Sequence, residues 1–218
     1  MKRLILLLAV IVCLAPFSFA GTIVYNNGAP NLQNGNEMTN WIQAEDFMLG
    51  TTTVITDVHF WTIEYLPSNG YAGSIWYGIY LDNGGQPNLG NPLVEGFLAG
   101  ANLTRTPTGR VALGTYDEFY YAFDIVPFTA QAGVTYWLGL HNGDLNNTAR
   151  AEVYWETTNF NGTITGNEDI LPPAGDGWSN NGQEHAFQLT SIPEPSSLFL
   201  MGSGVLGLAG LLRRKLNF

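Results

Sequence analysis

Short segments of alternating polarity recur along the chain, and they constrain its fold more than any other feature. Ser74–Leu81 is the clearest of them: its odd positions hold Ile, Tyr, Ile and Leu, and its even positions include Trp and Tyr. Successive side chains of a strand point to opposite faces, so both faces of this segment are apolar. The pattern predicts a central strand that is covered on both sides.

Similar segments, separated by clusters of Gly, Asn, Asp and Pro, extend through the interior of the chain. No stretch there keeps an apolar period of 3.6 residues beyond about two turns. The sequence therefore predicts an all-β, antiparallel, jelly-roll-like β-sandwich, with an open barrel as the alternative. The predicted strands are Thr22–Tyr25, Trp41–Leu49, Val54–Tyr65, Ser74–Leu81, Leu93–Leu98, Phe119–Ile125, Thr135–His141, Glu152–Thr157 and Glu184–Thr190.

The first twenty residues have the organisation of a signal peptide. Lys2 and Arg3 precede the apolar stretch Leu4–Ala15, and a small-x-small site ends at Ala20. Such a stretch is too short for a stable membrane span. We expect signal peptidase to cut between Ala20 and Gly21.

The other end of the chain carries a second apolar run. Leu198–Leu212 is followed by the basic cluster Arg213–Lys215. As a helix the run would extend about 22 Å, against about 30 Å of bilayer hydrocarbon. It also contains four glycines, which weaken a helix. We expect a short transmembrane helix at 198–212 that inserts with its basic tail, 213–215, on the cytoplasmic side.

Three elements in this order, Pro193-Glu194-Pro195, the glycine-bearing run and the basic cluster, resemble the PEP-CTERM sorting signal of Gram-negative bacteria. The resemblance covers about 27 residues, 192–218. It implies that an exosortase, an integral-membrane cysteine protease, recognises Pro193, Glu194 and Pro195 and cuts near them. It also implies release to the cell surface or the extracellular matrix, often in species that make exopolysaccharide. A plain single-span anchor is the alternative.

Between the two ends lies one predicted domain, residues 21–191. It keeps three arginines, no lysine and 17 acidic residues, a net charge of about −14. Such a surface repels phosphate backbones, so we expect no nucleic acid partner. The domain also has no cysteine, which excludes thiol chemistry and disulfides from it.

Parts of this domain also resemble β-sandwich bodies that are often joined to the same kind of tail. The matching stretches are Glu37–Phe47, Tyr136–Gly143 and Gly177–Gly182. Those bodies are largely uncharacterised, so the resemblance implies a fold and an exported setting and supplies no activity.

A structural calcium ion is one hypothesis for the domain. Ca²⁺ binds six to eight oxygens from carboxylates, amides and carbonyls. The stretch Ala44–Phe47 resembles the Ala-Glu-Asp-Tyr opening of some calcium-containing carbohydrate-binding modules, which makes Glu45 and Asp46 the candidate ligands.

Glycan binding is a second hypothesis. Trp178 lies in a predicted loop with Asn180 and Asn181, which suits stacking on a sugar and hydrogen bonding to its hydroxyls. His141 and His185, at strand ends, are the histidines best placed for a surface site. The chain has no Gly-x-Ser-x-Gly elbow, and no carboxylate pair is selected as catalytic by its spacing.

The sequence thus predicts an exported protein, held briefly in the inner membrane and then released to the cell surface or matrix. Its expected role is non-enzymatic, structural or adhesive, and associated with exopolysaccharide or biofilm. A specific carbohydrate-binding module and an extracellular hydrolase with an unrecognised site are the alternatives.

Overall fold

The computed structural model describes residues 21–88, 92–170 and 177–191. Within them, Ile23–Ser191 form one compact unit built from two antiparallel sheets. The predicted sandwich is therefore confirmed. Among the described residues, no helix is both long and apolar enough to cross a membrane. The predicted signal peptide at 1–20 and the predicted transmembrane helix at 198–212 lie outside these residues.

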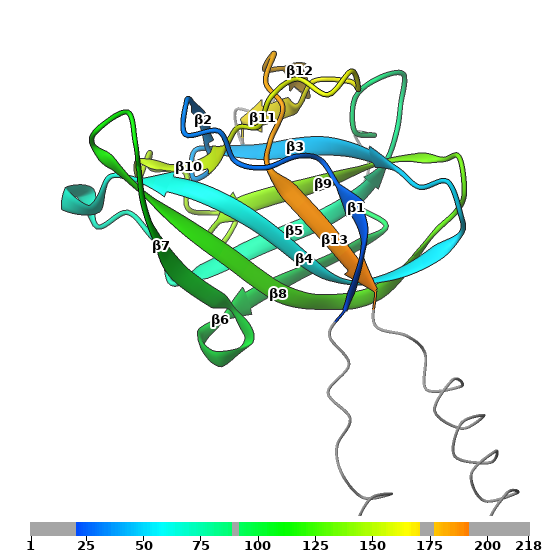
Figure 1. Cartoon of the computed structure of the whole chain (residues 1–218), viewed down its shortest axis with the longest axis horizontal. Helices are drawn as coiled ribbons and strands as arrows, with labels where there is room; N and C mark the ends of the chain where they lie inside the picture. Colours follow the sequence, from blue (N-terminus) through cyan, green and yellow to red (C-terminus); the bar gives the residue numbers. More distant parts are fainter. Residues whose placement is uncertain (1–20, 89–91, 171–176, 192–218) are drawn as a thin grey trace, which may run out of the picture. The chain divides into compact units, whose positions relative to one another are not determined.

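The first sheet, sheet A, is organised around the long strand β4 (Thr53–Glu64). One edge of β4 pairs with β8 (Tyr116–Ala130), which pairs in turn with β7 (Thr104–Ala112). Its other partners are β13 (Phe187–Ser191) and β10 (Val153–Glu156), and these connect to β1 (Thr22–Asn26) and β2 (Gly35–Glu37). Figure 1 looks onto sheet A, with β8 and β13 in front of strands of the second sheet.

The second sheet, sheet B, has six strands in the order β12-β11-β3-β9-β5-β6. Its bounds are β12 (Ser179–Asn180), β11 (Asn167–Ile170), β3 (Trp41–Met48), β9 (Thr135–Asn142), β5 (Ser74–Leu81) and β6 (Val94–Ala99). Two short 3-10 turns, Leu66–Ser68 and Gly100–Asn102, complete the described elements.

The main core lies between the sheets. Tyr121 and Phe123 of β8 pack there with Phe60 of β4 and Trp155 of β10. The predicted strand Phe119–Ile125 lies within β8, and its odd positions are all buried.

A second, smaller apolar cluster covers the opposite face of sheet B. It contains Ile42, Ala44, Trp76, Tyr80 and Trp137, and β5 therefore packs on both faces, as its sequence predicts. A Cβ at position 78 would lie 2.6 Å from the Trp76 ring. Only glycine lets that indole lie flat against the sheet.

Candidate functional site

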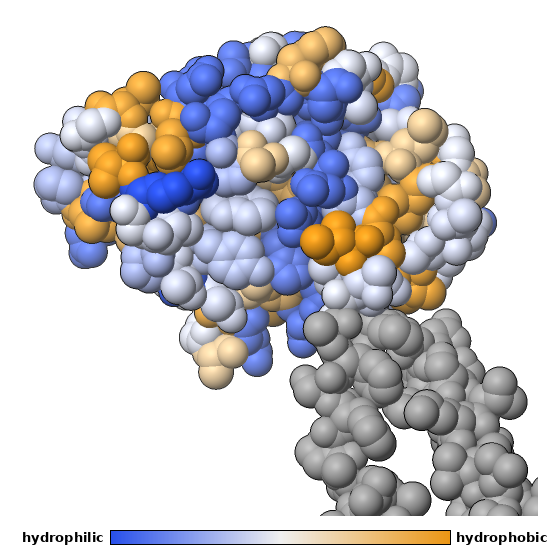
Figure 2. Space-filling model, in the orientation of Figure 1, coloured by the Kyte–Doolittle hydropathy of each residue, from blue (hydrophilic) through white to orange (hydrophobic). Residues whose placement is uncertain are grey.

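The outer face of sheet A carries polar and aromatic side chains that do not belong to the main core. On β4, Phe60 points inward, so Trp61 and Ile63 point to the opposite, outer face of the sheet. On β8, Tyr116 and Tyr120 occupy the matching outer positions, because Tyr121 points inward. Figure 2 shows this side, where apolar residues gather at the left, over the end of the β7–β8 hairpin.

At that end of the sheet lies a cavity of about 110 Å³, here called the tyrosine cavity. Tyr116 packs edge-to-face on Tyr154, with ring centroids 5.6 Å apart, and Tyr65 packs on Tyr116 at 5.9 Å. Tyr65 is 36% exposed. The lining residues are Asn34, Gly35, Ile63, Leu113, Tyr116 and Tyr154.

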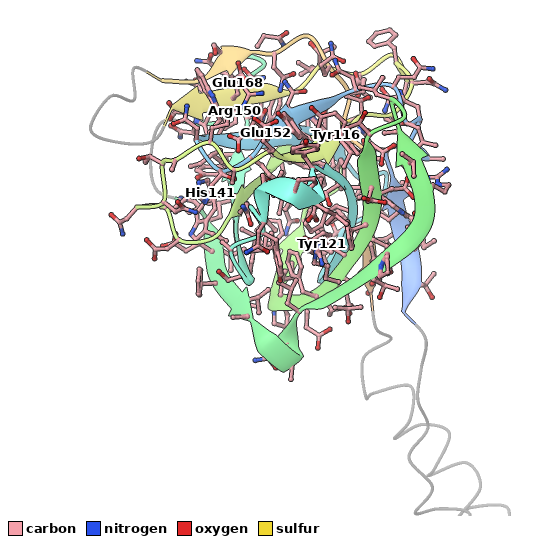
Figure 3. All side chains as sticks on the ribbon, turned by 90° about the vertical axis from the view of Figure 1, so that its left-hand side faces the viewer. Tyr116, Tyr121, His141, Arg150, Glu152 and Glu168 are labelled. Carbon is pink, nitrogen blue, oxygen red and sulfur yellow. The ribbon has the colours of Figure 1, made fainter. Side chains whose placement is uncertain are left out.

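The rim of the tyrosine cavity is held by a charged network. Arg150 Nε donates to Glu152 Oε1 at 2.9 Å, and its Nη2 donates to the Tyr154 hydroxyl at 2.6 Å. The Tyr154 hydroxyl in turn donates to Glu152. Burial, followed by the hydrogen bond to Glu152, raises the pKa of Tyr154 to about 12. Its phenol therefore stays protonated, and Figure 3 shows Arg150, Glu152 and Tyr116 together at this end.

Two residues beside the tyrosine cavity have backbone conformations that L-residues seldom adopt. Leu113, at the β7–β8 turn, has φ +51° and Glu152 has φ +59°. Leu113 is also 63% exposed, so neither backbone preference nor burial explains a leucine there. Strained residues of this kind cluster at binding and catalytic sites.

This arrangement suits a neutral ligand that is flat on one side and rich in hydroxyls. Tyrosine offers an apolar ring face for stacking and a hydroxyl for hydrogen bonding. The Asn34 amide and the Arg150–Glu152 pair add donors and acceptors around the rings.

The sequence predicted none of these cavity residues. Tyr116 and Tyr154 come from separate segments, and they meet only because β8 and β10 both pair with β4. One local indication of the cavity was available in Leu113-Gly114, where a large apolar residue precedes glycine in a turn.

The predicted sugar-stacking residue, Trp178, is only partly exposed. Its ring packs edge-to-face on Tyr80 at 5.5 Å and belongs to the small cluster on sheet B. The Asn180 side-chain nitrogen donates to the Thr165 carbonyl, and its side-chain oxygen accepts from the Thr165 hydroxyl. The Asn181 amide donates to Gln43 Oε1 at 3.0 Å. These two amides thus hold their own loop, and ligand binding by all three residues stays a prediction.

The predicted calcium ligands, Glu45 and Asp46, are adjacent on β3 and point to opposite faces. Glu45 Oε2 lies 2.7 Å from His185 Nδ1 and accepts a hydrogen bond from the His185 N–H at 2.8 Å. Burial raises the pKa of Glu45 well above its ordinary value and that of Asp46 to about 6. Within 21–88, 92–170 and 177–191, no group of three or more His, Asp or Glu side chains is arranged to hold a metal ion.

The expectation that His141 and His185 lie near the surface is wrong. Both are fully buried. His141 bonds the carbonyls of Thr39 and Gly143, while burial lowers the pKa of His185 to about 3.

The predicted processing sites fall largely outside the described residues. Gly21 is exposed just before β1, whereas Ala20 and the triplet Pro193, Glu194 and Pro195 are not described.

Comparison with known proteins bears on this last region. Residues 191–215 match the PEP-CTERM protein-sorting motif. The chain is therefore an exported protein that is targeted to exosortase and anchored transiently through its C-terminal signal. Neither the curated proteins nor the solved structures include a match to the chain.

Proposed function

We propose that this chain is a non-enzymatic structural or adhesive protein of the cell surface or extracellular matrix that holds exopolysaccharide. The observation that carries the proposal is the tyrosine cavity, where half-exposed rings surround a space with hydrogen-bonding groups at its rim.

In this proposal, signal peptidase removes residues 1–20 and exosortase acts near Pro193–Pro195. The part released contains the whole β-sandwich, 21–191, because β13 ends at Ser191, just before the Pro-Glu-Pro triplet. Release places the tyrosine cavity outside the cell, where exopolysaccharide is available as a ligand.

The burial of one carboxylate pair supports a binding role over hydrolysis. Glu118 and Glu156 interact on sheet A, but they are only 1% and 0% exposed. A glycosidase needs both carboxyl groups in contact with the sugar. The rings of the tyrosine cavity, in contrast, reach solvent.

The test uses the processed protein recovered after export from the host. Binding to a panel of exopolysaccharides is measured for the wild type, for Tyr116→Ala and for Tyr154→Ala. We expect each variant to bind about tenfold more weakly, which corresponds to roughly 1.4 kcal/mol for one lost stacking contact.

One control and one comparison variant locate the effect. Phe160→Ala removes a ring that is 71% exposed and does not line the tyrosine cavity, and it should leave binding unchanged. Trp178→Ala tests the loop that the sequence favours. Failure of the wild type to bind any glycan, or release of reducing sugars during the assay, would contradict the proposal.

A further inference from the structure

A second cavity, of about 360 Å³, opens beside β4 and β8 and is here called the aspartate cavity. Asp57 of β4 and Asp124 of β8 are direct partners across the sheet. The remaining lining residues are Leu98, Ala101, Asn102, Thr104, Ala122 and Phe123.

The two cavities are linked by one face of one strand. Asp57 lines the aspartate cavity and Ile63 lines the tyrosine cavity. Both residues lie on the outer face of β4, and the β4–β8 register is unbroken between them. Six residues of strand separate them by about 20 Å.

Aromatic side chains occupy the distance between the cavities. Trp61 lies midway on β4 and packs on Tyr120 of β8, with ring centroids 5.4 Å apart. The Tyr120 hydroxyl is hydrogen-bonded to His59 Nδ1, and burial raises the pKa of Tyr120. The face therefore alternates rings with hydrogen-bonding groups along its length, as an extended chain of sugars requires.

Charge decides which kind of polymer fits. The side chains of Asp57 and Asp124 are hydrogen-bonded to each other, which raises the pKa of Asp124, and burial adds to the shift. Both forms of a carboxyl group accept hydrogen bonds from sugar hydroxyls, and its ionised form also repels uronate or sulfate groups. The net charge of the domain, about −14, opposes a polyanion further.

We propose that the outer face of sheet A binds an internal segment of one uncharged polysaccharide chain, laid along β4 from the tyrosine cavity to the aspartate cavity. This inference rests on the proposed function and adds the ligand's charge, its length and its path.

The experiment compares uncharged oligosaccharides of increasing length, taken from a polysaccharide that the wild type binds. A fragment that fills the tyrosine cavity alone should bind weakly. Affinity should rise at least tenfold once the fragment exceeds about 20 Å, because it then reaches Asp57 and Asp124.

Variants separate the two ends of the path. Asp124→Ala and Trp61→Ala should remove the gain for long fragments and leave short fragments unaffected. Tyr154→Ala should weaken binding at every length. Glu95→Ala, an exposed acidic position on β6 of the other sheet, is the matched control and should change neither.

The experiment distinguishes failure of the extended binding path from failure of the proposed function. If short and long fragments bind equally and Asp124→Ala has no effect, the extended path is wrong while the proposed function stands. If no glycan binds, the proposed function itself fails. Tighter binding of a polyuronate than of the uncharged chain, or a dimer in sedimentation that Trp61→Ala disrupts, would also overturn the inference.

Discussion

At the scale of single residues, the Glu118–Glu156 pair has the clearest consequence. Arg110 Nε donates to Glu118 Oε2 at 2.7 Å and Thr108 donates to the same carboxylate, so the pKa of Glu118 is lowered despite its burial. Burial above all, together with the neighbouring Glu118, raises the pKa of Glu156 from about 4.5 to about 8. Glu156 therefore carries a proton at neutral pH.

A pH dependence of stability follows. Between pH 4.5 and 8 the folded protein keeps a proton on Glu156 that the unfolded chain has released, so stability falls as pH rises through this window. Glu156→Gln should remove that loss, which amounts to about 2 kcal/mol between pH 5 and 7. Urea unfolding at the two pH values measures it, with Glu95→Gln as the control. An unchanged slope in Glu156→Gln would show that another group is responsible.

The calcium hypothesis is also tested at this scale. The oxygens Glu45 Oε1 and Asp46 Oδ1 are buried without a hydrogen-bond partner among the described residues, although the two side chains leave β3 on opposite faces. Leaving buried oxygens unsatisfied is costly, and an oxygen-seeking cation would relieve that cost.

The hypothesis predicts that Ca²⁺ raises the melting temperature by several degrees, that EDTA reverses the rise and that Asp46→Asn abolishes it. Calorimetric titration provides the direct measurement. If the titration detects no uptake and EDTA leaves the melting temperature unchanged, the calcium hypothesis is wrong.

At the scale of elements, the β7–β8 hairpin combines strain with exposure. Leu113 has a positive φ, which asparagine adopts more readily than leucine does. We expect Leu113→Asn to stabilise the fold by roughly 0.5–1 kcal/mol and to weaken glycan binding, because the apolar wall of the tyrosine cavity is lost.

Thermal unfolding and the glycan assay together check this trade-off. Val126→Asn is the matched control: Val126 is 58% exposed, but it lies within β8 and is not among the residues with positive φ. Equal destabilisation by the two substitutions would contradict the assignment of strain to Leu113.

The observed strands show how much of the fold could be predicted from the sequence. All nine predicted strands are present, because each segment alternates in polarity or is rich in β-branched and aromatic residues, and turn residues separate the segments. β7 was missed: Pro107 and Gly109 interrupt it, and nearly all of it is exposed, so no apolar period marks it. β2, β11 and β12 are too short to carry a pattern.

The tyrosine cavity was missed for a different reason. Tyr116 and Tyr154 are brought together by strand register, and register depends on the whole sheet rather than on local sequence.

At the scale of the whole molecule, the sorting motif makes the strongest statement about location. We expect Pro193→Ala combined with Glu194→Ala to keep the chain in the inner membrane, because exosortase no longer recognises it. Cell fractionation with mass spectrometry of both termini measures this. The wild type should begin at Gly21 and end near Pro195, and Glu95→Ala should be processed normally.

An equivalent result should come from deleting the host's exosortase. If the double variant is still released with the same C-terminus, these residues are not the recognition site.

The position of β13 has a mechanical consequence. Its last residues lie beside Asp57, whereas the tyrosine cavity lies toward the other end of β4. A force applied between a glycan in that cavity and Ser191 would run parallel to both strands. The β13–β4 hydrogen bonds would then be loaded in shear, so that all of them resist the force together instead of breaking one after another.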